Sequence, residues 1–184
     1  MATVRDILAL LDGIAPLDTQ EEWDNSGLLA GNPDAEITRI LLALDLSEEV
    51  LLEAVESGAE LIVTHHPILF HARKNLREDD PEGRLLSNLV RARVALIAMH
   101  TNFDAARTGV NDALSERLTL RDVEPLALGM RVGRTSPAKF GEFAARIGRA
   151  LGGPVRAYGD PGREIRLVAV LGGAGGDGAR EAIA

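Results

Sequence analysis

Three of the four histidines in this sequence follow apolar stretches, which is a position that suits a metal site. His65 and His66 come directly after one such stretch, and His100 comes after another. Imidazole and carboxylate groups bind zinc, manganese, iron or nickel, whereas magnesium and calcium prefer oxygen ligands. The sequence contains no cysteine, so a metal here needs imidazole and carboxylate ligands. Asp104 is a carboxylate in the segment that begins at His100.

The adjacent pair His65 and His66 suggests two metal ions. Consecutive side chains of a strand point to opposite faces of the sheet. Both rings can therefore bind one ion only if the backbone bends, and Pro67 supplies a break at that point. Two neighbouring imidazoles therefore suit two neighbouring ions, with a carboxylate that completes or bridges the site. The simpler alternatives are that the His-His-Pro turn is a polar loop and that His100 is a buried histidine bonded to backbone. Asp45 fits equally well as a metal-competent residue and as a cap at a strand end.

The elements that would position these residues alternate in the order strand, helix, strand, helix, strand, helix. This order is typical of an α/β fold with mostly parallel sheets flanked by helices and right-handed crossovers. In such folds, ligand sites lie outside the carboxyl ends of the strands. The predicted elements are helices at 4–14, 48–57, 85–93 and 111–118 and strands at 40–44, 61–63 and 94–99.

We expect two parts, an N-terminal half at 1–120 that carries the metal motifs and a second half that begins at 121–184. In the second part, the turn-rich residues 122–139 are predicted to be a connection. A helix at 140–151, a short strand at 155–158 and a buried strand at 165–171 are predicted to follow.

The segment Gly173–Gly178 matches the G-x-G-x-x-G pattern of dinucleotide sites. A tight strand-to-helix turn is the simpler explanation, and no dinucleotide-binding residue is predicted.

Composition excludes some partners. The formal charge of −8 repels phosphate backbones, so nucleic acid is not an expected partner. No apolar run approaches the roughly 20 residues of a membrane span, and the N-terminus does not resemble a signal peptide, so we expect a cytoplasmic protein with no membrane partner.

Trp23 is expected in the core. Arg73, Lys74 and Arg77 are expected on a solvated face, with His71 exposed or beside Lys74.

Several segments, in chain order, resemble the GTP cyclohydrolase I type 2 family, also called the NIF-three-like family. The resemblance implies a dinuclear metal site in which His65 and His66 are ligands, Asp104 adds a carboxylate and His100 lies beside the site. It also implies a ring-shaped homohexamer. The matching segments are Trp23–Leu28, Leu44–Asp45, Ala59–Pro67, His100–Asp104, Gly109–Leu114 and Val168–Gly173.

The family pattern includes a further His and Glu after the Gly-rich turn, and no histidine follows His100 in this sequence. We therefore expect a fold that lacks its C-terminal portion and that binds metal weakly.

The family name implies metal-dependent hydrolysis of a small nucleotide, with water attack on the guanine ring of GTP and release of formate. No catalytic residue is predicted. The alternative function is a non-enzymatic, metal-binding, ring-shaped scaffold that recruits partners.

Overall fold

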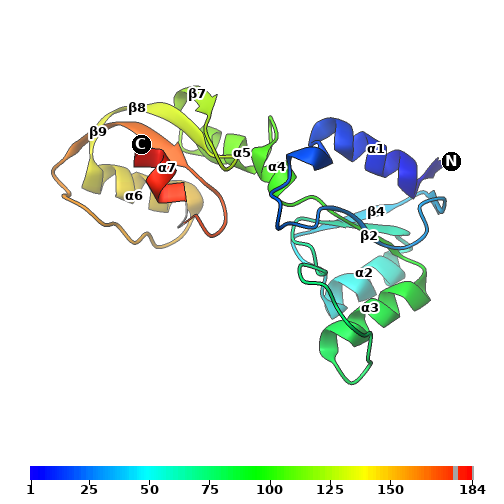
Figure 1. Ribbon diagram of the computed structural model, residues 1–184. Coiled ribbons are helices and arrows are strands. Elements are labelled where there is room, and N and C mark those ends of the chain that lie inside the picture. Colours follow the sequence, from blue (N-terminus) through cyan, green and yellow to red (C-terminus); the bar gives the residue numbers. More distant parts are fainter. Residues whose placement is uncertain (176–177, 184) are drawn as a thin grey trace. The chain divides into compact units, whose positions relative to one another are not determined.

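The computed structural model describes residues 1–175 and 178–183 (Figure 1). The chain divides into two compact units, Met1–Phe103 and Asp104–Ala184. The predicted halves at 1–120 and 121–184 stay a prediction about domain organisation.

The first unit contains a four-stranded sheet in the order β2-β6-β5-β4. Strands β4 and β6 pair in parallel with β5, as predicted, whereas β2 is antiparallel to β6. Helix α1 covers one face of this sheet, and α2 and α3 cover the other (Figure 1). The elements are β1 (Ala2–Thr3), α1 (Val4–Ile14), a 3-10 turn (Leu17–Thr19), β2 (Gly27–Ala30), β3 (Glu36–Ile37), β4 (Ile40–Ala43), α2 (Glu48–Ser57), β5 (Leu61–Thr64), α3 (Pro81–Ala92) and β6 (Ala95–Ala98).

Local capping explains where the two crossover helices begin and end. The Ser47 side chain accepts a hydrogen bond from the N–H of Val50, and α2 ends at Gly58 in the left-handed conformation. Helix α3 starts earlier than predicted, because Asp80 caps it and Pro81 occupies its first turn. These helices return the chain so that β4, β5 and β6 all run the same way.

The core of the first unit lies between the sheet and helices α2 and α3. Its side chains are aliphatic, as the low aromatic content predicts. The parallel register places Thr64 of β5 level with Ala98 of β6, so the two strands end side by side. The buried members of this core are Leu46, Leu51, Ala54, Ala59, Ile62, Leu85, Leu89, Val94 and Leu96.

The second unit contains a three-stranded antiparallel sheet in the order β7-β8-β9. Buried Leu118, Leu120 and Val170 form a small core with side chains of α5 and α6. The remaining elements are α4 (Thr101–Ala105), α5 (Val110–Arg117), β7 (Arg121–Pro125), β8 (Arg131–Lys139), α6 (Phe140–Leu151), β9 (Glu164–Val170) and α7 (Gly178–Ile183).

Two predictions for the second unit are wrong. Residues 122–139 are not a connection, because most of them belong to β7 and β8. Gly133 signalled a turn, but it lies within β8, where a Cβ would come within 3.0 Å of the side chains of Leu120 and Val123. Residues 155–158 are not a strand: they are exposed and belong to no helix or strand of the described residues.

The fold class is confirmed as α/β. No helix within the described residues is long and apolar enough to cross a membrane. Gly176 and Asp177 lie outside the described residues. Part of the segment Gly173–Gly178, which matches the dinucleotide pattern, is therefore not described by the structure.

Candidate metal centre

Three imidazole rings gather where β5 and β6 end. One ring nitrogen from each of His65, His66 and His100 lies within 4.8 Å of the other two. The ring centroids are 4.9 Å apart for His65 and His66, 5.2 Å for His65 and His100, and 5.5 Å for His66 and His100. These residues form a group that can hold a metal ion, and we call them the histidine cluster.

A backbone bend allows consecutive histidines to face the same place. Strand β5 ends at Thr64, and the N–H groups of both His65 and His66 then donate to the carbonyl oxygen of Leu44, at 3.2 and 3.0 Å. The hydroxyl of Thr64 donates to the carbonyl oxygen of His66 at 2.9 Å. The alternation expected of a strand is therefore broken at these two residues.

Each ring of the histidine cluster has its Nδ1 atom beside an acceptor oxygen. A carbonyl or carboxylate oxygen only accepts, so in the neutral ring Nδ1 carries the proton and Nε2 carries the lone pair. Three such nitrogens suit zinc and the neighbouring transition metals. The pairs are His65 with the Met99 carbonyl at 2.9 Å, His66 with Asp45 at 2.7 Å and His100 with Asp24 at 2.8 Å.

Asp24 is the most constrained carboxylate of this region. Its side chain is fully buried. Burial by itself would raise its pKa, but hydrogen bonds from His100, Thr101 and Asn25 outweigh that effect and lower the pKa to about 2. The carboxylate is thus ionised at neutral pH and fixes both His100 and the first residue of α4.

Sequence reasoning missed Asp24. The residue lies in the loop before β2, and its partner His100 is 76 residues further along the chain. The only signal was its place in the Trp23–Leu28 segment that carries the family resemblance. The sequence left Asp45 open as a metal-competent residue or as a cap at a strand end. In the structure its side chain contacts His66, while Ser47 caps helix α2.

Two expectations about surrounding residues need correction. Trp23 is not in the core: 59% of it is exposed, and its ring meets Phe70 edge to face. Arg73 is not on a solvated face, because its guanidinium is mostly buried and pairs with Asp80 and Glu82. His71 is exposed, as expected, and contacts the Phe70 ring.

Asp104 belongs to α4 and opens the second unit. Its backbone carbonyl accepts a hydrogen bond from the Asn111 amide at 3.1 Å, and Asn111 is fully buried. The role of Asp104 as a carboxylate ligand beside His65 and His66 stays a prediction.

Known proteins similar to this chain share its fold. A hypothetical protein of Staphylococcus aureus has a TM-score of 0.89 at 27% identity, over 98% of this chain and 75% of that one. Reduced HcgD from Methanocaldococcus jannaschii has a TM-score of 0.77 at 30% identity, over 95% of this chain and 71% of that one.

Two curated relatives are named GTP cyclohydrolase 1 type 2 homolog. The Streptomyces coelicolor protein is 36% identical over 95% of this chain, and the chain covers 66% of that protein's length. The Clostridium perfringens protein is 37% identical over 95% of this chain, and the chain covers 70% of its length. The model of the Duf34/NIF3 (NGG1p interacting factor 3) family matches residues 2–184. The chain therefore belongs to the Duf34/NIF3 family.

Proposed function

We propose that this protein binds two divalent metal ions through His65, His66 and Asp104 and uses them to hydrolyse a small nucleotide-like substrate. The observation that carries the proposal is the histidine cluster, in which each Nδ1 is held by an acceptor oxygen. This arrangement fixes the ring orientations before an ion arrives. His100, expected only beside the site, joins the candidate ligands because its ring nitrogen lies in the same group.

Two ions held by these residues would supply a water of lowered pKa and polarise the attacked centre. The surrounding residues orient the ligands: the Met99 carbonyl fixes His65 and Asp45 fixes His66, both just after β5, and Asp24 fixes His100. The names of the curated relatives support GTP as the first substrate to test.

The metal part of the proposal is tested by element analysis of protein purified without chelators. The His66→Ala variant should lose most of the bound metal while its melting temperature stays near that of the parent, because His66 is exposed at a strand end. His71→Ala is the matched control, since this fourth histidine is outside the cluster, and it should keep the parental metal content. Equal metal content in parent and His66→Ala would contradict the proposal.

The hydrolase part is tested by measuring formate release from GTP with added manganese, zinc or iron. Metal-dependent formate release that His66→Ala abolishes would support the enzyme. Bound metal without any hydrolysis would favour the alternative, a metal-binding scaffold that recruits partners.

We also propose self-association into the ring-shaped homohexamer that the resemblance implies, in the cytoplasm. Exposed apolar side chains on β4 and just after it support an interface between copies: Leu42 of β4 is 75% exposed, and Leu44, which follows the strand, is 61% exposed. Strand β4 lies at the edge of its sheet, where pairing with or packing against another chain is possible.

A further inference from the structure

Two exposed aromatic rings stand beside the histidine cluster. Trp23 and Phe70, 59% and 39% exposed, meet edge to face with centroids 5.6 Å apart. Each ring centroid is 6.2 Å from that of His100. Aromatic residues make up only 3% of the chain, and large rings normally stabilise a fold by being buried. Rings left exposed next to a candidate site are therefore available to a ligand.

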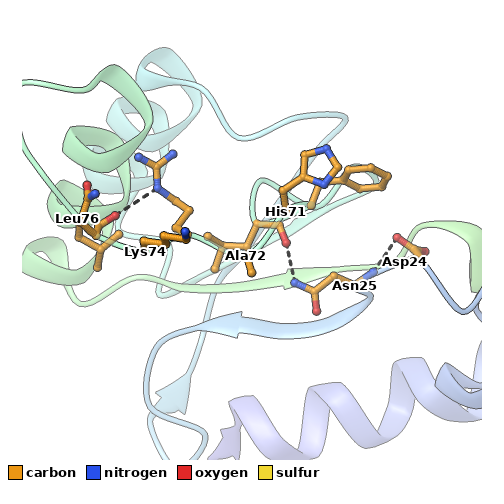
Figure 2. Close-up of a pocket in the computed structure, with 10 residues that line it drawn as sticks. Asp24, Asn25, His71, Ala72, Lys74 and Leu76 are labelled. Carbon is orange, nitrogen blue, oxygen red and sulfur yellow. Dashed lines mark hydrogen bonds between the residues drawn. The ribbon is translucent and has the colours of Figure 1, made fainter.

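A pocket of about 680 Å³ opens next to Phe70 (Figure 2). This volume falls within the range of small-molecule sites. Its walls are Asp24, Asn25 and the loop 69–76. We call Phe70 and His71 the aromatic wall, because both line the pocket and their rings contact each other. Trp23 does not line the pocket, but its ring contacts Phe70.

The loop that forms the pocket is anchored to the rest of the first unit. The Asn25 amide donates to the carbonyl oxygen of Leu69 at 2.7 Å, a bond that is visible in Figure 2. Further along, Arg73 is tied to Asp80 and Glu82 near the start of α3. The pocket is thus shaped before a ligand binds, which reduces the entropic cost of binding.

The pocket offers one cation that is not used by the protein. Arg73 is neutralised by two carboxylates, whereas Lys74 is exposed and forms no ion pair with any residue that the structure describes. Both residues line the pocket. In a chain with a net charge of −8, an unpaired ammonium group in a pocket favours an anionic group on the ligand.

We propose that this pocket binds a planar heteroaromatic ring that carries a phosphate, with the ring against the aromatic wall and the phosphate beside Lys74. The assignment of this ligand as the substrate rests on the proposed function, because Phe70 joins the pocket to the histidine cluster. The binding itself requires only the pocket, so it is measurable without metal.

Trp23 is the only tryptophan in the sequence, and its emission therefore reports on the aromatic wall. Metal-free protein is titrated with guanosine 5′-monophosphate, and parallel titrations use guanosine and ribose 5-phosphate. We expect saturable quenching by the nucleotide. Each half-molecule should bind at least about tenfold more weakly, because the ring and the phosphate each contribute to affinity.

Variants separate the two contributions. Phe70→Leu should weaken nucleotide binding about tenfold while the melting temperature stays close to the parental value. Lys74→Gln should weaken binding of the nucleotide and leave binding of guanosine unchanged. Lys139→Gln, which alters the other lysine of the sequence, is the control and should bind like the parent.

Absence of saturable quenching, or equal nucleotide affinity in Lys74→Gln and the parent, would overturn the proposal. Because the titration is done without metal, its failure leaves the metal and formate tests of the proposed function unaffected. Conversely, nucleotide binding without formate release would keep the pocket assignment and refute the proposed reaction.

Discussion

The rings of His66 and His100 are held by carboxylates in opposite environments. Asp24 is fully buried and bonded to several donors, whereas the Asp45 side chain is 61% exposed. An exposed ion pair contributes little to the free energy of folding. The role of Asp45 is therefore to orient the His66 ring that it contacts. The two aspartates therefore allow metal binding and folding to be separated by mutation.

Asp45→Asn should lower metal affinity by about tenfold, a loss typical of residues that orient metal ligands. The melting temperature of the metal-free variant should match that of the parent. Titration calorimetry with zinc and a thermal melt without metal check these two expectations. Asp24→Asn is the comparison, because it removes a buried hydrogen-bonded charge and should also lower the melting temperature. An Asp45→Asn variant with parental zinc affinity would show that this contact does not orient His66.

At the level of residues, the sequence predicted the histidines better than their partners. His65, His66 and His100 follow apolar runs, and that pattern is visible locally. Asp24 was not predicted, because its contact with His100 depends on how distant segments meet. Trp23 was misjudged for the same reason, since burial depends on tertiary packing that no local pattern encodes.

At the level of elements, the parallel strands were predictable because each is a continuous apolar run between capped helices. Strands β7 and β8 were hidden by Pro125, Gly133 and Pro137, which read as turn signals. The register of the β8–β9 pair shifts between Arg134 and Ala138, and Pro137 lies in this irregular stretch, where a missing N–H is tolerated. The burial of β8 residues against neighbouring strands outweighs these local preferences.

Glu60, just before β5, fixes the turn between β3 and β4. Its carboxylate accepts hydrogen bonds from the backbone N–H of Arg39 and from the hydroxyl and N–H of Thr38, and these lower its pKa from 4.5 to about 2. The pKa is depressed in the folded state, so the stabilisation is present above about pH 4.5 and is lost as the pH falls towards about 2.

Glu60→Gln should therefore lower the urea midpoint at neutral pH, and this difference from the parent should shrink as the pH falls below about 4.5. Urea titrations of both proteins across that interval measure the effect. Glu56→Gln is the control, because Glu56 also precedes β5 and its side chain is exposed. This variant should have the parental urea midpoint at neutral pH. A midpoint difference between Glu60→Gln and the parent that does not change with pH would contradict the role assigned to the ionised carboxylate.

At the level of the whole molecule, family membership was recognisable from short segments spread along the chain, and the family model matches residues 2–184. The assembly of copies was implied by resemblance alone. The exposed leucines on β4 and just after it, Leu42 and Leu44, add a physical reason, because an apolar edge strand favours association.

Leu42→Glu should reduce the particle mass measured by light scattering after size exclusion, because a charge on an edge strand opposes association. Leu52→Glu is the matched control: Leu52 is 57% exposed and belongs to helix α2 rather than to the sheet, and this variant should keep the parental mass. If the parent and Leu42→Glu have the same mass, the β4 leucines are not the interface.

The register that places Thr64 level with Ala98 has a consequence for the lifetime of the folded chain. His65 and His100 meet only after β5 and β6 have paired through the crossover helix α3, and pairing between distant segments is slow to form. A metal ion bound by these rings, as proposed above, would therefore stabilise contacts that complete late in folding. Such stabilisation slows unfolding and leaves the refolding rate nearly unchanged. With the proposed metal site occupied, the supply of metal would set how long a folded molecule survives proteolysis that depends on global unfolding.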